Sequence, residues 1–347
     1  VMQTLRTRSS TTIQGNMVLD NSAFDLPQAG PGDFDGEVLR PYNVQPDALM
    51  VNFKSVVLKF KPNTKRGVAE IEVEPPMAGL NVPATIPLRK GRCGDWRTHI
   101  RATLTEASRY RFAGGYPRAC GEQEWGIAYI EPDTYASKAL LGIWQSVGGK
   151  LTGQVVNGRV PATAKLLLRA PSLPLREIIM DVNKFSNNMM AQQVFLTLAL
   201  SPDRPATYDG ARQKIQRWWV QSMGNTTAVP TIDNGSGLSR DGRITADALV
   251  ALLQHAATHP QFKDFYDSLS IAGVDGTVSR MGQDGSTPLS IGNARLKTGS
   301  LKDVSAIAGY VSGMSGKTYA IAAMVNHDNA AKARAALYQL VEWAAAH

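Results

Sequence analysis

The chain has 347 residues, which is enough for two or three domains that bury a sizeable core. Its formal net charge is +8, which favours anionic partners such as a polyanionic cell wall or an anionic membrane surface; a solvated basic face without a partner is the alternative. Nucleic-acid binding is not indicated, because no basic helix, zinc-ligand spacing or basic-aromatic interleaving accompanies the charge. No apolar run reaches the ~18 residues of a membrane span, and no Gly-rich phosphate loop or dinucleotide fingerprint predicts a cofactor.

The N-terminal part of the chain, residues 1–132, is predicted to be a mainly β region. Short runs rich in β-branched and aromatic residues alternate there with connections rich in Pro and Gly. The predicted strands are 51–60, 67–73, 98–104 and 109–113. This region has no cluster of titratable residues typical of catalysis.

Cys93 and Cys120 are the only cysteines, and they flank a polar stretch of the β region. A disulfide between them would close a loop and stabilise the fold by roughly 3 kcal/mol, through the lost entropy of the unfolded chain. Such a bond requires an oxidising compartment. Two buried free thiols are the alternative.

From residue 133 the pattern changes to a mixture of helices and strands. A hairpin is predicted around Asn157-Gly158, and two β-rich C-terminal runs, joined by a Gly/Ser turn, follow a third strand. The predicted helices are 135–147, 175–200, 205–222, 245–258 and 329–346. This mixture predicts an α/β sandwich with helices on both faces of an antiparallel sheet. His255 and His259 lie four apart on one predicted helix, but no third ligand accompanies them, so no metal site is predicted.

The helix predicted for 175–200 contains Ser186-Asn187-Asn188. A serine followed two positions later by an amide can present a hydroxyl and an amide together at a helix end or bend. A helix cap or a solvated turn is the alternative interpretation. A Gly-punctuated polar loop follows at 233–240, where Arg240 can bind a carboxylate bidentately; a plain connection is the alternative.

Lys297-Thr298-Gly299-Ser300 is predicted to lie on an edge strand near the C-terminus. A lysine at this position can bind a carboxylate and shuttle a proton, and Gly299, which has no Cβ, lets a ligand backbone approach. These properties suit serine acyl-transfer chemistry. An ordinary surface Lys-Thr-Gly turn is the alternative, because short motifs have many false matches.

These motifs, together with 272–277, occur in an order and at spacings that resemble those of the class C low-molecular-mass penicillin-binding proteins, the D-alanyl-D-alanine carboxypeptidase/endopeptidase family. The run 13–24 resembles the family segment that opens its inserted domains, so the resemblance covers essentially the whole chain. It implies an α/β fold with a transpeptidase/β-lactamase-like antiparallel sheet flanked by helices. Residues 133–347 would then be the C-terminal part of the catalytic domain, and 1–132 a mainly β insertion.

The family's nucleophile lies in a Ser-x-x-Lys motif, and the sequence contains none, since no lysine has a serine or threonine three residues before it. The nearest pairs, Ser55 with Lys59 and Thr134 with Lys138, are four apart. Either the nucleophile segment precedes Val1 and is missing, or the chain comes from a member that has lost catalysis. We expect the first, and we expect the printed chain alone to be unable to form an acyl-enzyme.

The resemblance implies a role for each motif residue. Ser186 would relay a proton to the leaving amine, and Asn188 would hydrogen-bond the substrate amide. Lys297 would raise the local positive potential and assist proton transfer. Thr298 would bind the substrate carboxylate, and the Ser300 N–H would be one oxyanion donor.

Substrate side-chain recognition in the family uses an acidic residue and an aromatic residue of the insert together with the loop arginine. Asp20, Phe24 and Arg240 match this pattern, although Asp20 and Phe24 could equally be a turn residue and a core aromatic. Asn234 stands where an aspartate is common, and Lys302 where a glutamine can contribute to the pocket. These two departures leave the fine specificity open.

The resemblance therefore implies a serine-type D-Ala-D-Ala carboxypeptidase and endopeptidase of the periplasm that needs no cofactor or metal. Its partners would be peptidoglycan stem peptides and β-lactams. A non-catalytic peptidoglycan-binding relative is the first alternative, and a serine β-lactamase or esterase the second. The sequence leaves the choice between a monomer and a homo-oligomer open.

Overall fold

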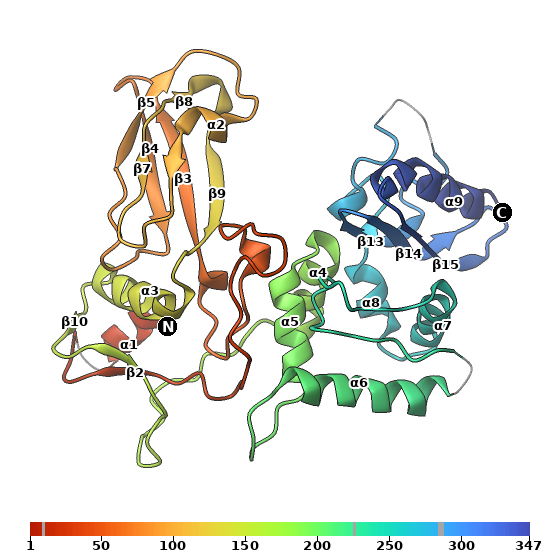
Figure 1. Ribbon diagram of the computed structural model, residues 1–347, viewed down its shortest axis with the longest axis horizontal. Helices are drawn as coiled ribbons and strands as arrows, with labels where there is room; N and C mark the ends of the chain where they lie inside the picture. The colour runs from red at the N-terminus through yellow and green to blue at the C-terminus, as the bar shows by residue number, and fades with distance from the viewer. Residues whose placement is uncertain (9–10, 225–226, 284–287) are drawn as a thin grey trace. The chain divides into compact units, whose positions relative to one another are not determined.

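The computed structural model describes residues 1–8, 11–224, 227–283 and 288–347, and it divides into two compact units, Val1–Ala170 and Pro171–His347. Figure 1 colours the first unit red to yellow and the second green to blue. Each unit is described by itself.

The first unit is built on a five-stranded sheet with the strand order β8-β5-β4-β3-β9 (Figure 1). Strand β3 (Ser55–Asn63) pairs antiparallel with β4 (Val68–Glu74) and with β9 (Gln123–Ala128). Strand β5 (Thr85–Arg89) pairs antiparallel with β4, and β8 (Tyr116–Pro117) pairs in parallel with β5. The strands predicted at 51–60 and 67–73 are thus confirmed, with shifted ends.

Alternation along β3 builds the core of this unit. Val56, Leu58 and Phe60 are fully buried, as the period of two in a strand requires for one face. The Phe60 ring stacks on Tyr116 at 5.3 Å and meets Trp96 edge-on at 5.3 Å. These aromatic contacts add to the apolar area that the core buries.

Cys93 and Cys120 form a disulfide across 27 residues, which confirms the predicted pairing and excludes the free thiols. The strand predicted at 98–104 is wrong in its first half, because 96–100 form the helix α2 (Trp96–Ile100). Trp96 and Ile100 lie four apart and are both buried, so one face of a helical turn covers the core. The remaining short elements of the disulfide loop are β6 (Ala102–Thr103), β7 (Arg111–Phe112) and η3 (Arg118–Cys120).

The first strands of the chain pair with strands that follow α3 (Pro132–Ser146). β1 (Thr12–Ile13) pairs in parallel with β10 (Lys150–Leu151), and β2 (Met17–Leu19) with β11 (Val155–Asn157). The hairpin predicted around Asn157-Gly158 is therefore wrong, because the strand ending there pairs with β2. The unit also contains α1 (Met2–Arg8), η1 (Pro41–Asn43) and η2 (Asn52–Lys54).

These pairings explain why the first compact unit extends to Ala170, well past the composition change at 132/133. Helix α3 is joined to the β region by a hydrogen bond from the Tyr135 hydroxyl to the Ser55 carbonyl (2.7 Å). The assignment of 1–132 as an insertion into a catalytic domain formed by 133–347 stays a prediction.

The second unit contains a four-stranded antiparallel sheet with the order β12-β13-β14-β15. Its strands are β12 (Ser270–Ile271), β13 (Ala294–Leu301), β14 (Val304–Ser312) and β15 (Thr318–Asn326). The C-terminal hairpin and the preceding strand with Lys297 are confirmed.

Helices cover both faces of this sheet, as predicted. On one face, Ile307 and Val311 of β14 pack in a cluster with Leu337 and Val341 of α9 (Arg334–Ala346). On the other face, Tyr310 packs with Leu253 of α7 (Ala246–Ala257), and its hydroxyl donates to the Leu253 carbonyl at 2.6 Å. The unit also contains α6 (Tyr208–Met223), α8 (Phe262–Ser268), η4 (Gly276–Val278) and η5 (Ala330–Ala333).

The helix predicted for 175–200 is in fact two helices, α4 (Leu175–Phe185) and α5 (Asn188–Thr197). Ser186 has left-handed backbone angles (φ 54°, ψ 45°), which end α4. Asn187 caps α5, because its Oδ1 accepts a hydrogen bond from the Met190 N–H at 3.0 Å. The apolar periodicity runs through the break and hides it from sequence analysis.

Within the residues that the structure describes, no helix combines the length and the apolar character needed to cross a bilayer.

Candidate active site

Lys297 lies on β13 with its amine inside the second unit. The Nζ atom donates to Ser186 Oγ at 2.5 Å and to the Thr298 carbonyl at 2.7 Å. Burial lowers the pKa of Lys297 to about 8, since desolvation disfavours the charged amine. Near neutral pH this lysine can therefore both hold and release a proton, which an ordinary surface lysine cannot do.

The edge of β13 beside Lys297 is open. Strand β12 pairs only with Arg295 and Leu296, so within the described ranges no strand pairs with 297–301 on the side away from β14. The predicted edge strand is thus correct for the motif itself, although β13 is an inner strand over its first residues. A Cβ on Gly299 would have only the Ala306 Cβ within 4 Å, at 3.6 Å, so the glycine leaves this edge accessible.

The break between α4 and α5 brings Ser186 to this edge. The left-handed backbone of Ser186 costs an L-residue about 1 kcal/mol, and the turn directs the hydroxyl to Lys297. Asn188, at the start of α5, donates from Nδ2 to the Ser236 carbonyl at 2.8 Å. The structure therefore joins Ser186, Asn188 and Lys297, as the sequence predicted, through a bend that the sequence did not reveal.

The polar loop 233–240 forms another wall. Asn234 Oδ1 accepts hydrogen bonds from the Ser236 N–H (3.0 Å) and hydroxyl (2.7 Å), which fixes the turn. Gly235 has φ +78°, and a Cβ there would lie 2.5 Å from Phe195, so this position needs a glycine. Arg212 holds the start of the loop by donating to the Asp233 carbonyl and to its carboxylate.

Thr298 meets a further wall formed by η4. Its hydroxyl donates to Thr277 Oγ1 at 2.8 Å, so two hydroxyls lie together at the cleft. Lys184 fixes this segment through an ion pair with Asp275 at 2.5 Å, and the other carboxylate oxygen of Asp275 accepts from the Ile271 N–H. Hydroxyls in such a pair can donate to a carboxylate.

These walls enclose a cleft of about 600 Å³ in the second unit, large enough for a small peptide group. It is lined by Ser186, Asn188, Gly235, Ser236, Thr277, Lys297, Thr298, Gly299 and Ser300, among others. The polar groups of the lining include hydroxyls, amides, the Lys297 amine and the Arg334 guanidinium, and apolar side chains such as Ile307 and Leu337 complete it.

Arg240 already has a carboxylate partner within the chain, and its role as a substrate anchor stays a prediction. Its guanidinium forms an ion pair with Asp303, which lowers the pKa of that carboxyl. Both side chains are about half exposed and line a second cavity of about 1300 Å³, which also includes Gly299 and Ser300. Lys302 is exposed and is not part of the lining of either cavity.

Asp20 and Phe24 belong to the first unit, and the structure does not place them relative to the cleft. The Asp20 carboxylate accepts from the Ser22 hydroxyl (2.6 Å) and N–H and from the Val160 N–H (2.7 Å). These hydrogen bonds, the Ser22 hydroxyl first, lower its pKa to about 2. The turn interpretation of Asp20 thus has structural support, and its recognition role stays a prediction.

Sequence reasoning missed three residues that position the site: Lys184, Asp275 and Arg212. Each acts through a partner 21 to 91 residues away along the chain, so no local spacing could reveal the pairing. The one available signal was that Asp275 and Thr277 belong to the run 272–277. Within the described ranges no group of three His, Cys, Asp or Glu side chains could hold a metal ion.

Comparison with known proteins finds carboxypeptidases among the similar chains. The chain is 25% identical over 330 residues to the D-alanyl-D-alanine carboxypeptidase DacB of Haemophilus influenzae, covering 93% of this chain and 67% of that protein. It is 26% identical to the D-alanyl-D-alanine carboxypeptidase of Actinomadura sp. strain R39, covering 88% of this chain and 58% of that protein. The chain thus spans about two thirds or less of the length of these relatives.

The fold resembles the crystal structure of penicillin binding protein 4 (dacB) from Haemophilus influenzae, with a TM-score of 0.72 at 22% identity over 97% of this chain and 77% of that one. A family model, that of the D-Ala-D-Ala carboxypeptidase 3 (S13) family, matches residues 1–347. The match extends over the whole chain, so the chain belongs to the D-Ala-D-Ala carboxypeptidase 3 (S13) family.

Proposed function

We propose that this chain contributes to a serine-type D-Ala-D-Ala carboxypeptidase and endopeptidase that cleaves peptidoglycan stem peptides through an acyl-enzyme. One observation carries the proposal: Lys297 Nζ lies 2.5 Å from Ser186 Oγ in a cleft that Asn188 and Thr298 also line. Family membership supports the same chemistry.

In this proposal Ser186 and Lys297 move the proton. The leaving amine of the terminal D-Ala must gain a proton as its C–N bond breaks, and the Ser186 hydroxyl can supply it while Lys297 replaces it. A lysine with a pKa of about 8 suits this exchange, because its two protonation states are close in free energy near neutral pH. The left-handed turn at Ser186 keeps the hydroxyl within hydrogen-bond distance of Lys297 Nζ.

Asn188, Thr298 and Ser300 bind the substrate. The Nδ2 of Asn188 is held by the Ser236 carbonyl, which orients its Oδ1 acceptor for a substrate N–H. The hydroxyls of Thr298 and Thr277 bind the terminal carboxylate, and positive charge on Lys297 strengthens that binding. The open edge of β13 lets the substrate backbone pair as an added strand, and the Ser300 N–H acts as an oxyanion donor.

The side-chain pocket is the less supported part of the proposal. Arg240 lines the second cavity, next to Gly299 and Ser300, and so lies beside the reaction cleft with Asp303 as its carboxylate partner. A substrate carboxylate that binds Arg240 would have to share the guanidinium with Asp303 or displace Asp303 from it. Asp20, Phe24 and Lys302 stay predicted contributors to side-chain recognition.

The periplasm is the proposed compartment. The disulfide between Cys93 and Cys120 suits an oxidising environment, and the substrate is found in the cell wall. The Haemophilus influenzae protein forms a crystalline complex with a β-lactam, and we propose that β-lactams acylate this protein as well.

The test is to label the longest form of the protein that its gene encodes with a fluorescent penicillin and to measure its intact mass. The proposed function requires a stable adduct of one β-lactam per chain. The printed chain has no Ser-x-x-Lys and should remain unlabelled. A folded protein with no adduct would instead favour the non-catalytic peptidoglycan-binding relative, and rapid penicillin hydrolysis would favour the β-lactamase.

A further inference from the structure

The positive charge of the first unit is concentrated in one short segment. Residues 89–120 contain eight Lys and Arg and two Asp and Glu, a net charge of +6, whereas the whole chain has +8. The rest of the first unit, 1–88 and 121–170, has thirteen cationic and thirteen acidic residues and is therefore neutral. Charge concentrated in this way creates a positive potential that attracts anions to one part of the surface.

Seven of these cations are exposed and have no ion pair among the residues that the structure describes; the eighth, Arg111, pairs with Glu106 at 3.0 Å. Arg109 forms a backbone bridge with Asn81, outside the segment 89–120. The other six, named here the basic tip, are Arg89, Lys90, Arg92, Arg97, Arg101 and Arg118.

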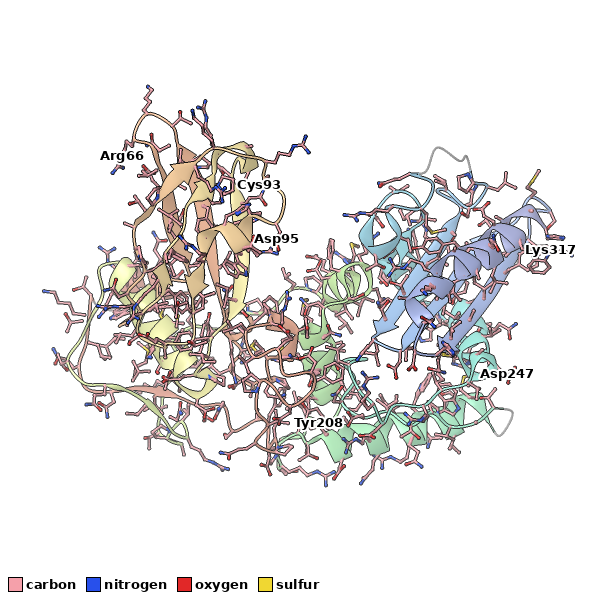
Figure 2. The ribbon with its side chains drawn as sticks, turned by 45° about the horizontal axis from the view of Figure 1, so that its top comes forward. Arg66, Cys93, Asp95, Tyr208, Asp247 and Lys317 are labelled. Carbon is pink, nitrogen blue, oxygen red and sulfur yellow. A yellow bond between two sulfur atoms is a disulfide. The ribbon has the colours of Figure 1, made fainter. Side chains whose placement is uncertain are left out.

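The fold gathers the basic tip at one end of the sheet. Arg89 ends β5 and is paired in register with Pro117 of β8, directly before Arg118. The disulfide of Cys93 ties the loop after β5 to the same place. Figure 1 draws β5, β8 and α2 together at this end, and Figure 2 labels Cys93 and Asp95 there.

The basic tip is rigid where it meets the core. The Arg97 guanidinium lies over the rings of Trp96 (5.3 Å) and Trp125 (5.8 Å), and Arg101 donates to the Ala113 carbonyl at 2.7 Å. Because these contacts already restrict Arg97 and Arg101, the two side chains lose less entropy on binding than free side chains would.

The composition of the basic tip limits the chemical classes of partner that it can bind. Five of the six cations are arginines, whose guanidinium groups bind planar carboxylates and phosphates bidentately. Among the described residues of 85–120 none is a large exposed apolar side chain that could enter a bilayer, and Trp96 is buried, so it offers no base-stacking platform. The chemistry that fits is a water-exposed polymer with repeated oxyanions.

We propose that the basic tip binds the carboxylate-bearing peptides of peptidoglycan strands and so holds the enzyme on its polymeric substrate, separately from the reaction cleft. The inference rests on the proposed function, because it takes peptidoglycan as the polymer that the enzyme meets. It adds a binding surface in the first unit to a cleft in the second.

The experiment measures how the full chain cosediments with purified peptidoglycan sacculi over a range of salt concentrations. The test variant is K90Q/R92Q/R118Q, whose three side chains make no hydrogen bond, ion pair or ring contact with the residues that the structure describes. The matched control is R159Q/K165Q/R169Q, three exposed cations of the same unit outside the tip. We expect the test variant to bind about tenfold more weakly than the unchanged chain, with a shallower salt dependence, and the control to stay within about twofold.

Three results would overturn the proposal: equal binding of the test variant and the unchanged chain, an equal loss in the control, or binding to polyphosphate beads with none to sacculi. Thermal unfolding of both variants checks that the fold is intact. The variant Lys297→Met separates the two proposals, because it should bind sacculi normally while losing penicillin labelling. If the unchanged full-length protein binds sacculi but is not labelled by penicillin, the proposed function is wrong, and the proposed binding of peptidoglycan by the basic tip is still supported.

Discussion

In the first unit the buried lysine Lys54 has a carboxylate partner, Asp47, at 2.8 Å, with both side chains nearly inaccessible. In the second unit the partly buried amine of Lys297 contacts a hydroxyl and a carbonyl, and among the described residues it has no ion pair. A paired buried charge holds structure together, whereas an unpaired one has its pKa displaced and is ready for proton transfer. We therefore propose that Lys54 has a structural role and that Lys297 takes part in proton transfer.

The largest expected effect follows from removing the unpaired amine. In the longest form of the protein that its gene encodes, Lys297→Met should slow acylation by penicillin about 10³-fold, because both the proton path and the positive potential at the carboxylate site disappear. Stopped-time labelling gives the rate. An acylation rate within threefold of that of the unchanged protein would show that Lys297 has no role in the acylation.

The next effect belongs to the first unit alone. Replacing Cys93 and Cys120 by serine should destabilise this unit by about 3.5 kcal/mol, since the disulfide closes a loop across 27 residues. Hydrogen exchange in β3 and β9 reports the loss. The strands β13 and β14 serve as the internal control, and equal loss in both units would mean that their stabilities are not separate.

The paired and unpaired lysines can be compared directly by the same substitution. Lys54→Met removes the cation that pairs with the largely buried Asp47 carboxylate and should cost about 3 kcal/mol of unfolding free energy. Lys297→Met removes a desolvated amine and should leave stability unchanged or raise it by about 1 kcal/mol. Denaturant unfolding of the two variants measures the difference in unfolding free energy. Similar losses in the two variants would contradict the distinction between a structural Lys54 and a reactive Lys297.

The smallest effect concerns the turn between α4 and α5. Ser186→Gly relieves the left-handed strain of the backbone and should stabilise the second unit by about 1 kcal/mol, while it removes the hydroxyl that contacts Lys297. The thermal unfolding temperature of the variant should rise, while its rate of penicillin labelling should fall. A destabilised variant would mean that the hydroxyl matters more to folding than the turn does.

The fold class and the residues of the cleft could be predicted from the sequence, because strand alternation, helical periodicity and short motifs are local signals. The break at Ser186 could not, since the apolar period continues through it and only tertiary contacts select the left-handed turn. The pairing of β11 with β2 and of Arg240 with Asp303 joins distant segments, which spacing does not encode. The low pKa of Lys297 likewise depends on burial that only the folded chain creates.

The most direct test of this account is an NMR titration of lysine Cε resonances in the chain, with Lys297 assigned by its absence from Lys297→Met. The lowered pKa means that Lys297 should be protonated below about pH 8 and neutral above it, so we expect its titration midpoint near pH 8. A midpoint near the ordinary lysine value of about 10.5 would contradict the claim that this cleft holds an amine prepared for proton transfer.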